Sequence, residues 1–369
     1  MAITRLGPNQ DITAAKIAGQ INFKNLIING DMSIAQRGTS VSGITSTSYN
    51  TLDRYRTGVS GFGTWTQSQD TDVPTGQGFA NSLKMDCTTA SGPDAAGSVL
   101  YLVQYIEAQN LQQLKFGTSN AESTTISFWV KTNVTGTYTV EIVSSDSGRH
   151  ICGTYTVNAS NTWEKKTITF EGDTTGTINN DNGRGFEVFF WLGAGSEFTS
   201  GTLATSWATS SAGNRVSSSQ ANLATSTDNN FWITGVQLEA DTAASDFEFL
   251  PYDVNLRRCV RYFQKIDFDS GDDAVAFGYS INNSQSIYYY NFRNGTMRSA
   301  PSITTSSVSN GFRYQISGAE DLQRNNIPNK DLISTTNVQF GNNQSTITAN
   351  RPARMRMQSG AFINFDAEL

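Results

Sequence analysis

His150 is the only histidine in the chain, and Cys152 lies two residues after it in the segment SGRHICGTY. If this segment is a strand, the two side chains point to the same face, which a nucleophile and its general base would require. Neither residue lies in a nucleophile elbow or in the sequence context of a known cysteine hydrolase. We therefore interpret the pair as structural and predict no nucleophilic site.

Three glutamates in strand-like segments, Glu107, Glu141 and Glu187, are the candidates for cleaving a glycosidic bond. That reaction needs two carboxylates about 5 to 10 Å apart across the bond, and the sequence alone pairs none of them. They serve equally well as groups on strand surfaces. The sequence also lacks a P-loop, a GxGxxG motif after a strand and a zinc-spaced Cys/His cluster. We predict no catalytic residues and no enzyme.

Sugar binding needs aromatic rings that stack on pyranose C–H groups, with polar groups nearby for the hydroxyls. The candidate glycan contacts are Trp65, Trp207 and the run Tyr288-Tyr289-Tyr290. Strand alternation places Tyr288 and Tyr290 on one face and Tyr289 on the other, so at least one face is structural. Trp207 lies in a segment that offers little core around it. Three further tryptophans lie inside strand patterns and are predicted to be in the core: Trp129, Trp163 and Trp232.

The composition favours β-structure with many turns. The 369 residues predict two domains, or one domain with a large insertion. Charged residues make up 16% of the chain, below the roughly 25% of an average soluble protein. The 11% of aromatic residues argues against disorder over most of the length. Three cysteines without a CxxC pair predict synthesis in a reducing compartment.

The charge distribution and hydropathy exclude two classes of partner. Residues 1–250 carry a net charge of −8 and residues 251–369 a net charge of +2, without a strongly basic stripe. Nucleic-acid binding is therefore not expected. No apolar run approaches the roughly 20 residues of a membrane span, and the N-terminal sequence MAITRLGPNQDI has no apolar signal-peptide core.

The chain divides into an N-terminal attachment segment (1–21), a β-domain (22–250), a junction helix (251–265) and a smaller C-terminal β-domain (266–369). The attachment segment is too short to form a core of its own. Repeated short strand patterns separated by turn residues predict an all-β sandwich from residue 22, with a first strand at Phe23–Ile28. Residues 193–230 form a small, polar, almost uncharged insertion.

The boundary between the domains is marked by Pro251, which cannot continue a central strand. Asp253 can cap the helix that follows. The apolar residues after it fall at helical spacing, while arginines and a lysine occupy the other faces. The helical apolar set consists of Leu256, Cys259, Val260 and Phe263.

Several motifs in order resemble bacteriophage tail fibres and related virion proteins. The segments NLIINGDMSIAQRGTS and YNTLDRYRTG resemble the opening of their jelly-roll domains. The stretch 102–143 and the segments NTWEKKTITF and WITGVQLEADTAASDFEF resemble strands of carbohydrate-binding-module sandwiches. LRRCVRYFQK resembles the segment that follows these sandwiches, and MRSAPSIT resembles a C-terminal strand-turn motif. The resemblance covers about residues 22–305, and the insertion at 193–230 departs from it.

The resemblance implies a jelly-roll virion protein made in the host cytoplasm and located on the tail rather than the head. Its expected partners are two further copies of itself, a virion protein bound through residues 1–21, and a host surface glycan. We expect the homotrimer contact at Leu256, Val260 and Phe263, although these residues could instead cap their own sandwich. The alternatives are a capsid decoration or head-fibre protein of similar fold, and a glycan-degrading tailspike.

The resemblance also implies a structural calcium near the first and last strands of the sandwich, and no other cofactor. Asp31 and Glu239 could supply the hard oxygen ligands that calcium prefers. The alternative is that Asp31 caps a turn and Glu239 is an exposed surface group.

Overall fold

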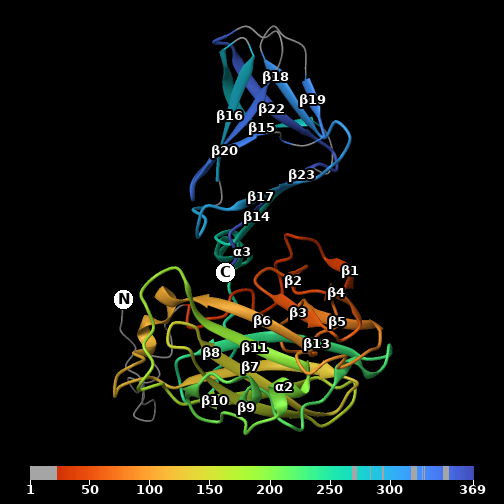
Figure 1. Cartoon of the computed structure of the whole chain (residues 1–369), viewed down its shortest axis with the longest axis vertical. Helices are drawn as coiled ribbons and strands as arrows, with labels where there is room; N and C mark the ends of the chain where they lie inside the picture. The colour runs from red at the N-terminus through yellow and green to blue at the C-terminus, as the bar shows by residue number, and fades with distance from the viewer. Residues whose placement is uncertain are drawn as a thin grey trace, which may run out of the picture.

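The computed structural model confirms the all-β prediction (Figure 1). It describes residues 23–267, 272–282, 284–292, 295–316, 322–325, 327, 329–343 and 349–369. The predicted attachment segment at 1–21 lies outside these residues. Within them, every helix is too short or too polar to cross a membrane.

The first domain is a sandwich of two antiparallel sheets. Sheet 1 has the order β1 (Ser40–Ile44), β4 (Thr64–Asp70), β5 (Ser82–Thr89), β13 (Asn230–Glu239), β7 (Thr124–Thr132) and β10 (Glu164–Phe170). Sheet 2 has the order β12 (Ala208–Thr209), β9 (Arg149–Val157), β8 (Gly136–Ser144), β11 (Arg184–Ala194), β6 (Val99–Glu107), β3 (Arg56–Ser60) and β2 (Ser48–Tyr49). Alternate residues such as Ile126, Phe128 and Val130 of β7 fill the space between the sheets.

The segment Phe23–Ile28 is not the strand that the sequence predicts. It runs beside β13 with an irregular backbone. The side chain of Asn25 takes the place of backbone hydrogen bonds to β13. Its Oδ1 accepts from the backbone N–H of Leu238, and its Nδ2 donates to the carbonyl of Val236. A side-chain amide can satisfy both kinds of backbone group, so the segment remains attached to the sheet without strand geometry.

The insertion at 193–230 is an ordered cover over the outer face of sheet 2. It contains α2 (Ser196–Thr199), β12, and the 3-10 turns η2 (Ala212–Asn214) and η3 (Leu223–Thr225). Phe198 and Val216 pack on Phe189 and Trp191 of β11. The polar composition therefore does not make this stretch a free loop, because its few apolar residues are those that contact the sheet.

The second domain also consists of two sheets, and it stands apart from the sandwich beyond a narrow junction (Figure 1). Sheet 3 has the order β14 (Phe263–Asp267), β23 (Phe362–Asp366) and β17 (Ser302–Thr305). Sheet 4 has the order β19 (Leu322–Arg324), β18 (Phe312–Ile316), β22 (Pro352–Gln358), β15 (Asp272–Asn282), β16 (Gln285–Asn291), β21 (Asn337–Asn343) and β20 (Asn329–Ile333). Tyr288, Tyr314, Phe340, Met355 and Phe365 belong to its separate core.

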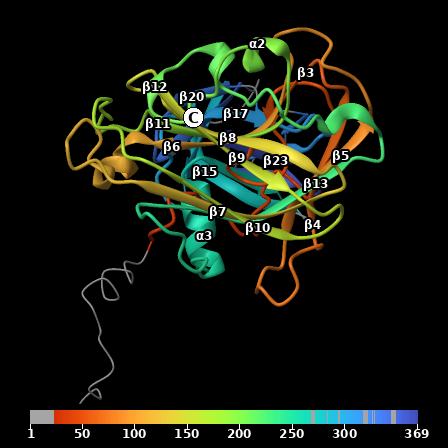
Figure 2. The ribbon, with the colours of Figure 1, turned by 90° about the horizontal axis from the view of Figure 1, so that it is seen from below.

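The junction helix is shorter than predicted. The helix α3 spans Tyr252–Val260, begins after Pro251 and has no side-chain cap, so Asp253 is not its N-cap residue. Phe263 and Lys265, which the helical spacing assigned to this helix, belong to β14. A segment this short fits both the seven-residue apolar spacing of a helix and the alternating pattern of a strand. Residues 263–267 form a strand because they pair with β23. In Figure 2, α3 lies at the margin of the sandwich.

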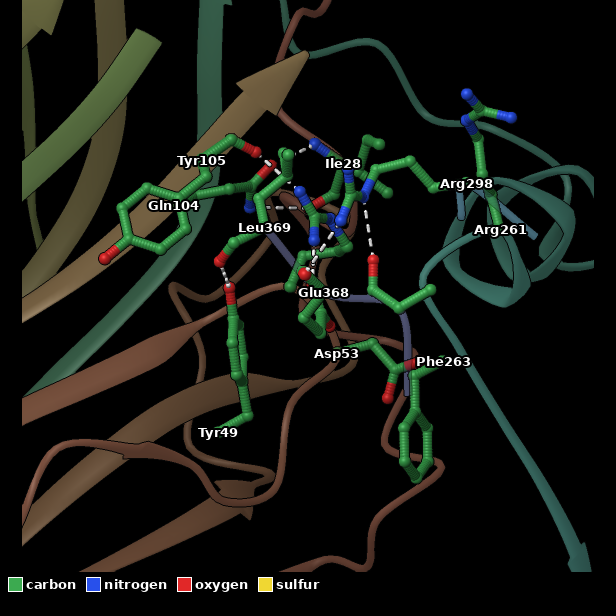
Figure 3. Close-up of polar contacts among 12 residues, drawn as sticks. Ile28, Tyr49, Asp53, Gln104, Tyr105, Arg261, Phe263, Arg298, Glu368 and Leu369 are labelled. Carbon is green, nitrogen blue, oxygen red and sulfur yellow. Dashed lines mark hydrogen bonds and ion pairs between the residues drawn. The ribbon is translucent and has the colours of Figure 1, made fainter. Parts of the chain in front are cut away.

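A buried network joins the two domains where residues 366–369 meet the sandwich (Figure 3). The carboxylate of Glu368 pairs with Arg54, which is fully buried, and with Arg37 at 3.4 Å. Arg54 also donates to the carbonyl of Tyr105, and its guanidinium lies 3.4 Å from the ring centre of Tyr262. The charge of Arg54 is thus compensated by a residue of the other domain.

Two further contacts extend this junction. Arg261 at the end of α3 holds Glu107 of β6 through two hydrogen bonds of 2.7 and 2.8 Å. The guanidinium of Arg298 in the second domain donates to the backbone carbonyl of Asn182 in the sandwich, and the backbone carbonyl of Arg298 accepts a hydrogen bond from the side-chain amide of Asn182. The guanidinium of Arg261 suits its two-bond contact with the carboxylate of Glu107 because its donors lie in a fixed fork.

Asp53 gives the junction a pH dependence that can be measured. Burial raises the pKa of Asp53 from 3.8 to about 6, while Arg37 and Gln36 oppose this rise. Because its folded-state pKa is raised, Asp53 stabilises the fold below its unfolded pKa, and this contribution is lost as the pH rises through about 6. We expect Asp53→Asn to gain stability relative to the wild type between pH 4 and pH 6, by roughly 1 kcal/mol per pH unit. Urea unfolding of both proteins at several pH values checks this, and a difference that is constant with pH would contradict it.

Candidate functional site

Both tryptophans that the sequence proposed as sugar contacts are buried, and these two predictions are corrected. Trp65 is fully buried in the sandwich core and donates its Nε1–H to the carbonyl of Phe62. Trp207 is 9% exposed, donates to the carbonyl of Glu171 and packs against the ring of Phe116. The insertion supplies little core of its own, but the ring of Trp207 reaches the sandwich core.

The three consecutive tyrosines of β16 alternate as predicted. Tyr288 is fully buried and Tyr290 is 8% exposed, since both point into the core of the second domain. Neither can stack on a sugar, so these two contacts are corrected. Tyr289 points to the opposite face of sheet 4 and is 43% exposed. It is the one member of the predicted set that stays available as a glycan contact.

Tyr289 lies beside two exposed aromatic residues that the sequence reasoning missed. Phe277 of β15 is its direct cross-strand partner and is 61% exposed, and Tyr279 on the same strand is 44% exposed. We call Phe277, Tyr279 and Tyr289 the aromatic platform. The segment AVAFGYSI carries a signal for it: small residues alternate with Phe277, Tyr279 and Ile281, so that the large side chains face outward.

Polar side chains flank the aromatic platform in the same row of sheet 4. The strand register places Arg354 of β22 beside Phe277, and Gln339 of β21 beside Tyr289. Gln315 of β18 pairs with Arg354 and accepts a hydrogen bond from its Nε. The row therefore reads amide, guanidinium, two aromatic rings and amide. Such an order offers apolar faces in the middle, with donors and acceptors at both ends.

Three other tryptophans of the sandwich are neither in the core nor freely accessible. Trp129, Trp163 and Trp232, which the sequence placed in the core, are half-buried on the outer face of sheet 1. Lys131 covers this group, with its Nζ 4.2 Å from the ring centre of Trp232 and 5.7 Å from that of Trp163. Because a cation occupies these ring faces, they are less open to a sugar than the aromatic platform.

The residues predicted for the homotrimer contact pack mostly within their own chain. Val260 is 1% exposed and Phe263 is 2% exposed, so this prediction is corrected for both. Leu256 is half-buried against Cys259, Tyr262 and their neighbours. The alternative interpretation, a cap on their own sandwich, fits Leu256, which packs with Ile28 and Ile34, and Phe263, whose ring centre lies 3.6 Å from the guanidinium carbon of Arg37.

The residues predicted for calcium do not form a calcium site. Asp31 accepts hydrogen bonds through its Oδ1 from Ser33 and Asn255. Glu239 accepts from Ser245 and lies 3.9 Å from the Nζ of Lys24. Both carboxylates already face hydrogen-bond donors or a cation, and they share no partner. This donor-filled environment does not fit a metal ion that needs six to eight free oxygen ligands.

One buried cluster in the described part of the chain does combine metal-ligand types, namely Glu141, His150 and Cys152. Glu141 accepts from Nδ1 of His150 at 2.9 Å, from Nε of Arg215 at 2.9 Å and from the indole of Trp191 at 3.0 Å. Arg215 thus supplies the positive charge that this carboxylate requires. Burial raises the pKa of the Cys152 thiol, which opposes formation of a thiolate. The cluster anchors the insertion to sheet 2.

No family model matches the chain, and no curated protein matches it. Among solved structures, the enzymatically active domain of tailspike protein 4 of bacteriophage CBA120 aligns with 12% identity and a TM-score of 0.30, over 58% of this chain and 21% of that chain. A family 30 carbohydrate-binding module aligns with 10% identity and a TM-score of 0.27, over 62% and 93% of the two chains. The tandem family 22 modules of Paenibacillus barcinonensis Xyn10C align with 10% identity and a TM-score of 0.25, over 91% and 98%. The β-sandwich assignment itself comes from the strand pairing described above.

Proposed function

We propose that this protein is a structural protein of a phage virion, a trimeric tail-fibre subunit that binds a host surface glycan through the aromatic platform. The order of tail-fibre-like motifs along the sequence supports the virion role. The observation that carries the binding role is the exposed row of Phe277 and Tyr289 between Arg354 and Gln339. Aromatic faces with flanking hydrogen-bonding groups are the design that sugar recognition requires.

Exposure distinguishes this row from an ordinary sheet surface. A row of two large rings at 61% and 43% exposure leaves apolar faces in water, and a ligand that covers them gains the free energy of burying that area. The third ring, Tyr279, widens the surface along the strand. A pyranose presents flat C–H faces and rim hydroxyls, which match the rings and the flanking amides respectively.

The proposal is tested by measuring binding of the full chain to a printed array of bacterial surface polysaccharides. We expect a subset of neutral or mixed polysaccharides to bind, and soluble fragments of the same polysaccharide to compete. Absence of binding to every polysaccharide of the host that the virion infects would reject the receptor role.

We further propose that the protein binds glycans without cleaving them. Two of the glutamates suited to hydrolysis are held by arginines: Glu107 by Arg261, and Glu141 by Arg215. The bond between Arg261 and Glu107 lowers the pKa of Glu107 against the effect of burial, which is the opposite of what a general acid needs. Incubation with the bound polysaccharide should leave its chain length unchanged, and shortened chains would establish a tailspike enzyme.

The trimer in this proposal would use an apolar surface other than the one predicted from the helix. Phe23, Phe249 and Tyr252 are 54%, 51% and 63% exposed, and they lie before the sandwich and around the start of α3. Large exposed apolar groups of this kind mark contact surfaces. Light scattering at micromolar concentration should give three times the mass of the chain, and a stable monomer would contradict the trimer.

A further inference from the structure

A large cavity lies between α3, the 3-10 helix η1 (Ala108–Leu114) and the first described residues of the chain. Its volume is about 1020 Å³. Its lining contains three arginines of α3 and its end, and three amide side chains of η1. These residues are Arg257, Arg258 and Arg261, and Gln109, Asn110 and Gln113. The aromatic platform belongs to the other domain, so this cavity is separate from it.

The positive charge of the cavity is only partly balanced. Arg261 is neutralised by its two hydrogen bonds to Glu107. Arg258 is half-buried and donates to the backbone carbonyl of Asn25 at 3.1 Å, but no carboxylate lies within ion-pair distance of it among the described residues. Arg257 is exposed and has neither a hydrogen bond nor an ion pair with any described side chain. The lining therefore has two guanidinium groups that form no salt bridge with any residue that the structure describes.

The acidic groups near these two arginines do not cancel their charge. Asp253 is the single carboxylate among the described residues that line the cavity. Burial lowers the pKa of Arg258, and the negative charge of Glu248, which acts in the opposite direction, does not offset this effect. A half-buried cation without a paired anion is unfavourable, and a bound anion would relieve that cost.

The rest of the lining is suited to a sugar rather than to a bare ion. Val254, which is half-buried, supplies apolar surface, while Asn110 and Gln113 supply amides that can bond hydroxyls. The volume lies at the upper end of the range for pockets that bind small molecules, which leaves room for more than one sugar ring.

We propose that this cavity binds an acidic sugar, with the carboxylate or sulfate of the sugar held between Arg257 and Arg258. The guanidinium fork matches the planar oxygens of a carboxylate in a bidentate manner. The inference rests on the proposed function, because it takes the ligand to be a glycan, and it adds a charge requirement to what the protein recognises.

Calorimetry on the full chain tests this with four probes: trigalacturonate, neutral galactotriose, a sulfated chondroitin disaccharide and glucose 6-phosphate. We expect an anionic sugar to bind at least tenfold more tightly than galactotriose. Comparing the three anionic probes shows whether the cavity prefers a carboxylate, a sulfate or a phosphate. Arg257→Gln with Arg258→Gln should weaken this binding at least tenfold. Arg351→Gln, an exposed arginine of the second domain, should leave it unchanged.

Three results would overturn the inference. The first is that the protein binds trigalacturonate no more tightly than galactotriose and binds neither of the other anionic sugars. The second is that the double variant binds the anionic sugar as tightly as the wild type, and the third is that Arg351→Gln weakens this binding as much as the double variant does. Arg257→Gln is also measured alone, because this exposed residue can be replaced without disturbing the fold. Tyr289→Ala should not affect binding in the cavity. If Tyr289→Ala left polysaccharide binding unchanged while the cavity variants lost acidic-sugar binding, the platform would be rejected and the cavity proposal would stand.

Discussion

Glu368→Gln is expected to lower the free energy of unfolding by about 3–5 kcal/mol, the typical cost of removing one partner from a buried ion pair. The carboxylate of Glu368 is 4% exposed, and its partner Arg54 is completely buried. Without Glu368, the guanidinium of Arg54 keeps its neutral contacts with Tyr105 and Tyr262 but loses its counter-charge. Equilibrium unfolding in urea, followed by tryptophan fluorescence and circular dichroism, measures the change.

The matched control for this change is Glu122→Gln. Glu122 pairs with Lys115, and the two side chains are 46% and 54% exposed, so its loss should cost less than about 1 kcal/mol. A similar effect of both variants would show that burial of Glu368 does not matter. The pair of Arg54 and Glu368 also joins the two domains. Small-angle scattering should therefore show a wider spread of domain positions for Glu368→Gln than for Glu122→Gln.

Phe277→Ala combined with Tyr289→Ala is expected to abolish measurable binding of a neutral polysaccharide at the platform, with a rise of about 100-fold or more in Kd. Truncation of each ring removes a contact that contributes roughly 1–2 kcal/mol to the binding free energy. Both rings lie at the centre of the proposed site, where truncation reduces affinity most. Both side chains are exposed in sheet 4, so the variant should unfold at nearly the same temperature as the wild type. Binding to the array polysaccharide gives the first quantity and thermal unfolding the second.

Val308→Ala is the control for the platform, because Val308 is 36% exposed in the second domain and belongs neither to a proposed sugar site nor to the proposed trimer surface. It should leave the Kd unchanged. The platform could alternatively serve as a contact between copies of the chain. In that case the double variant would change the mass in light scattering while leaving glycan affinity intact, and the proposed site would be wrong.

Alternation along a strand is a local property, and the sequence therefore predicts much of the fold. The separation of Tyr289 from Tyr288 and Tyr290 is an example, since successive side chains of any strand point to opposite faces. The all-β class and the boundary at Pro251 follow from similarly local signals. The end of the junction helix does not, because pairing with β23 places Phe263 in a strand.

The location of an aromatic side chain in the core or on the surface depends on distant parts of the chain. Trp65 and Trp232 both lie in strands of sheet 1, yet the first is fully buried and the second faces outward. Sequence assigned these two the wrong way round, because the face that is covered depends on which sheet packs against it.

The sequence by itself determined that this protein is built from short strands in two domains, and that one tyrosine of its β16 segment faces away from the others. The tertiary structure alone brought Phe277 beside Tyr289, Arg354 beside Phe277, and Arg54 into contact with Glu368, 314 residues away. Periodicity records which way a side chain points. Strand pairing and packing decide which residues it contacts there, and the proposed sites are made of such contacts between residues distant in the sequence.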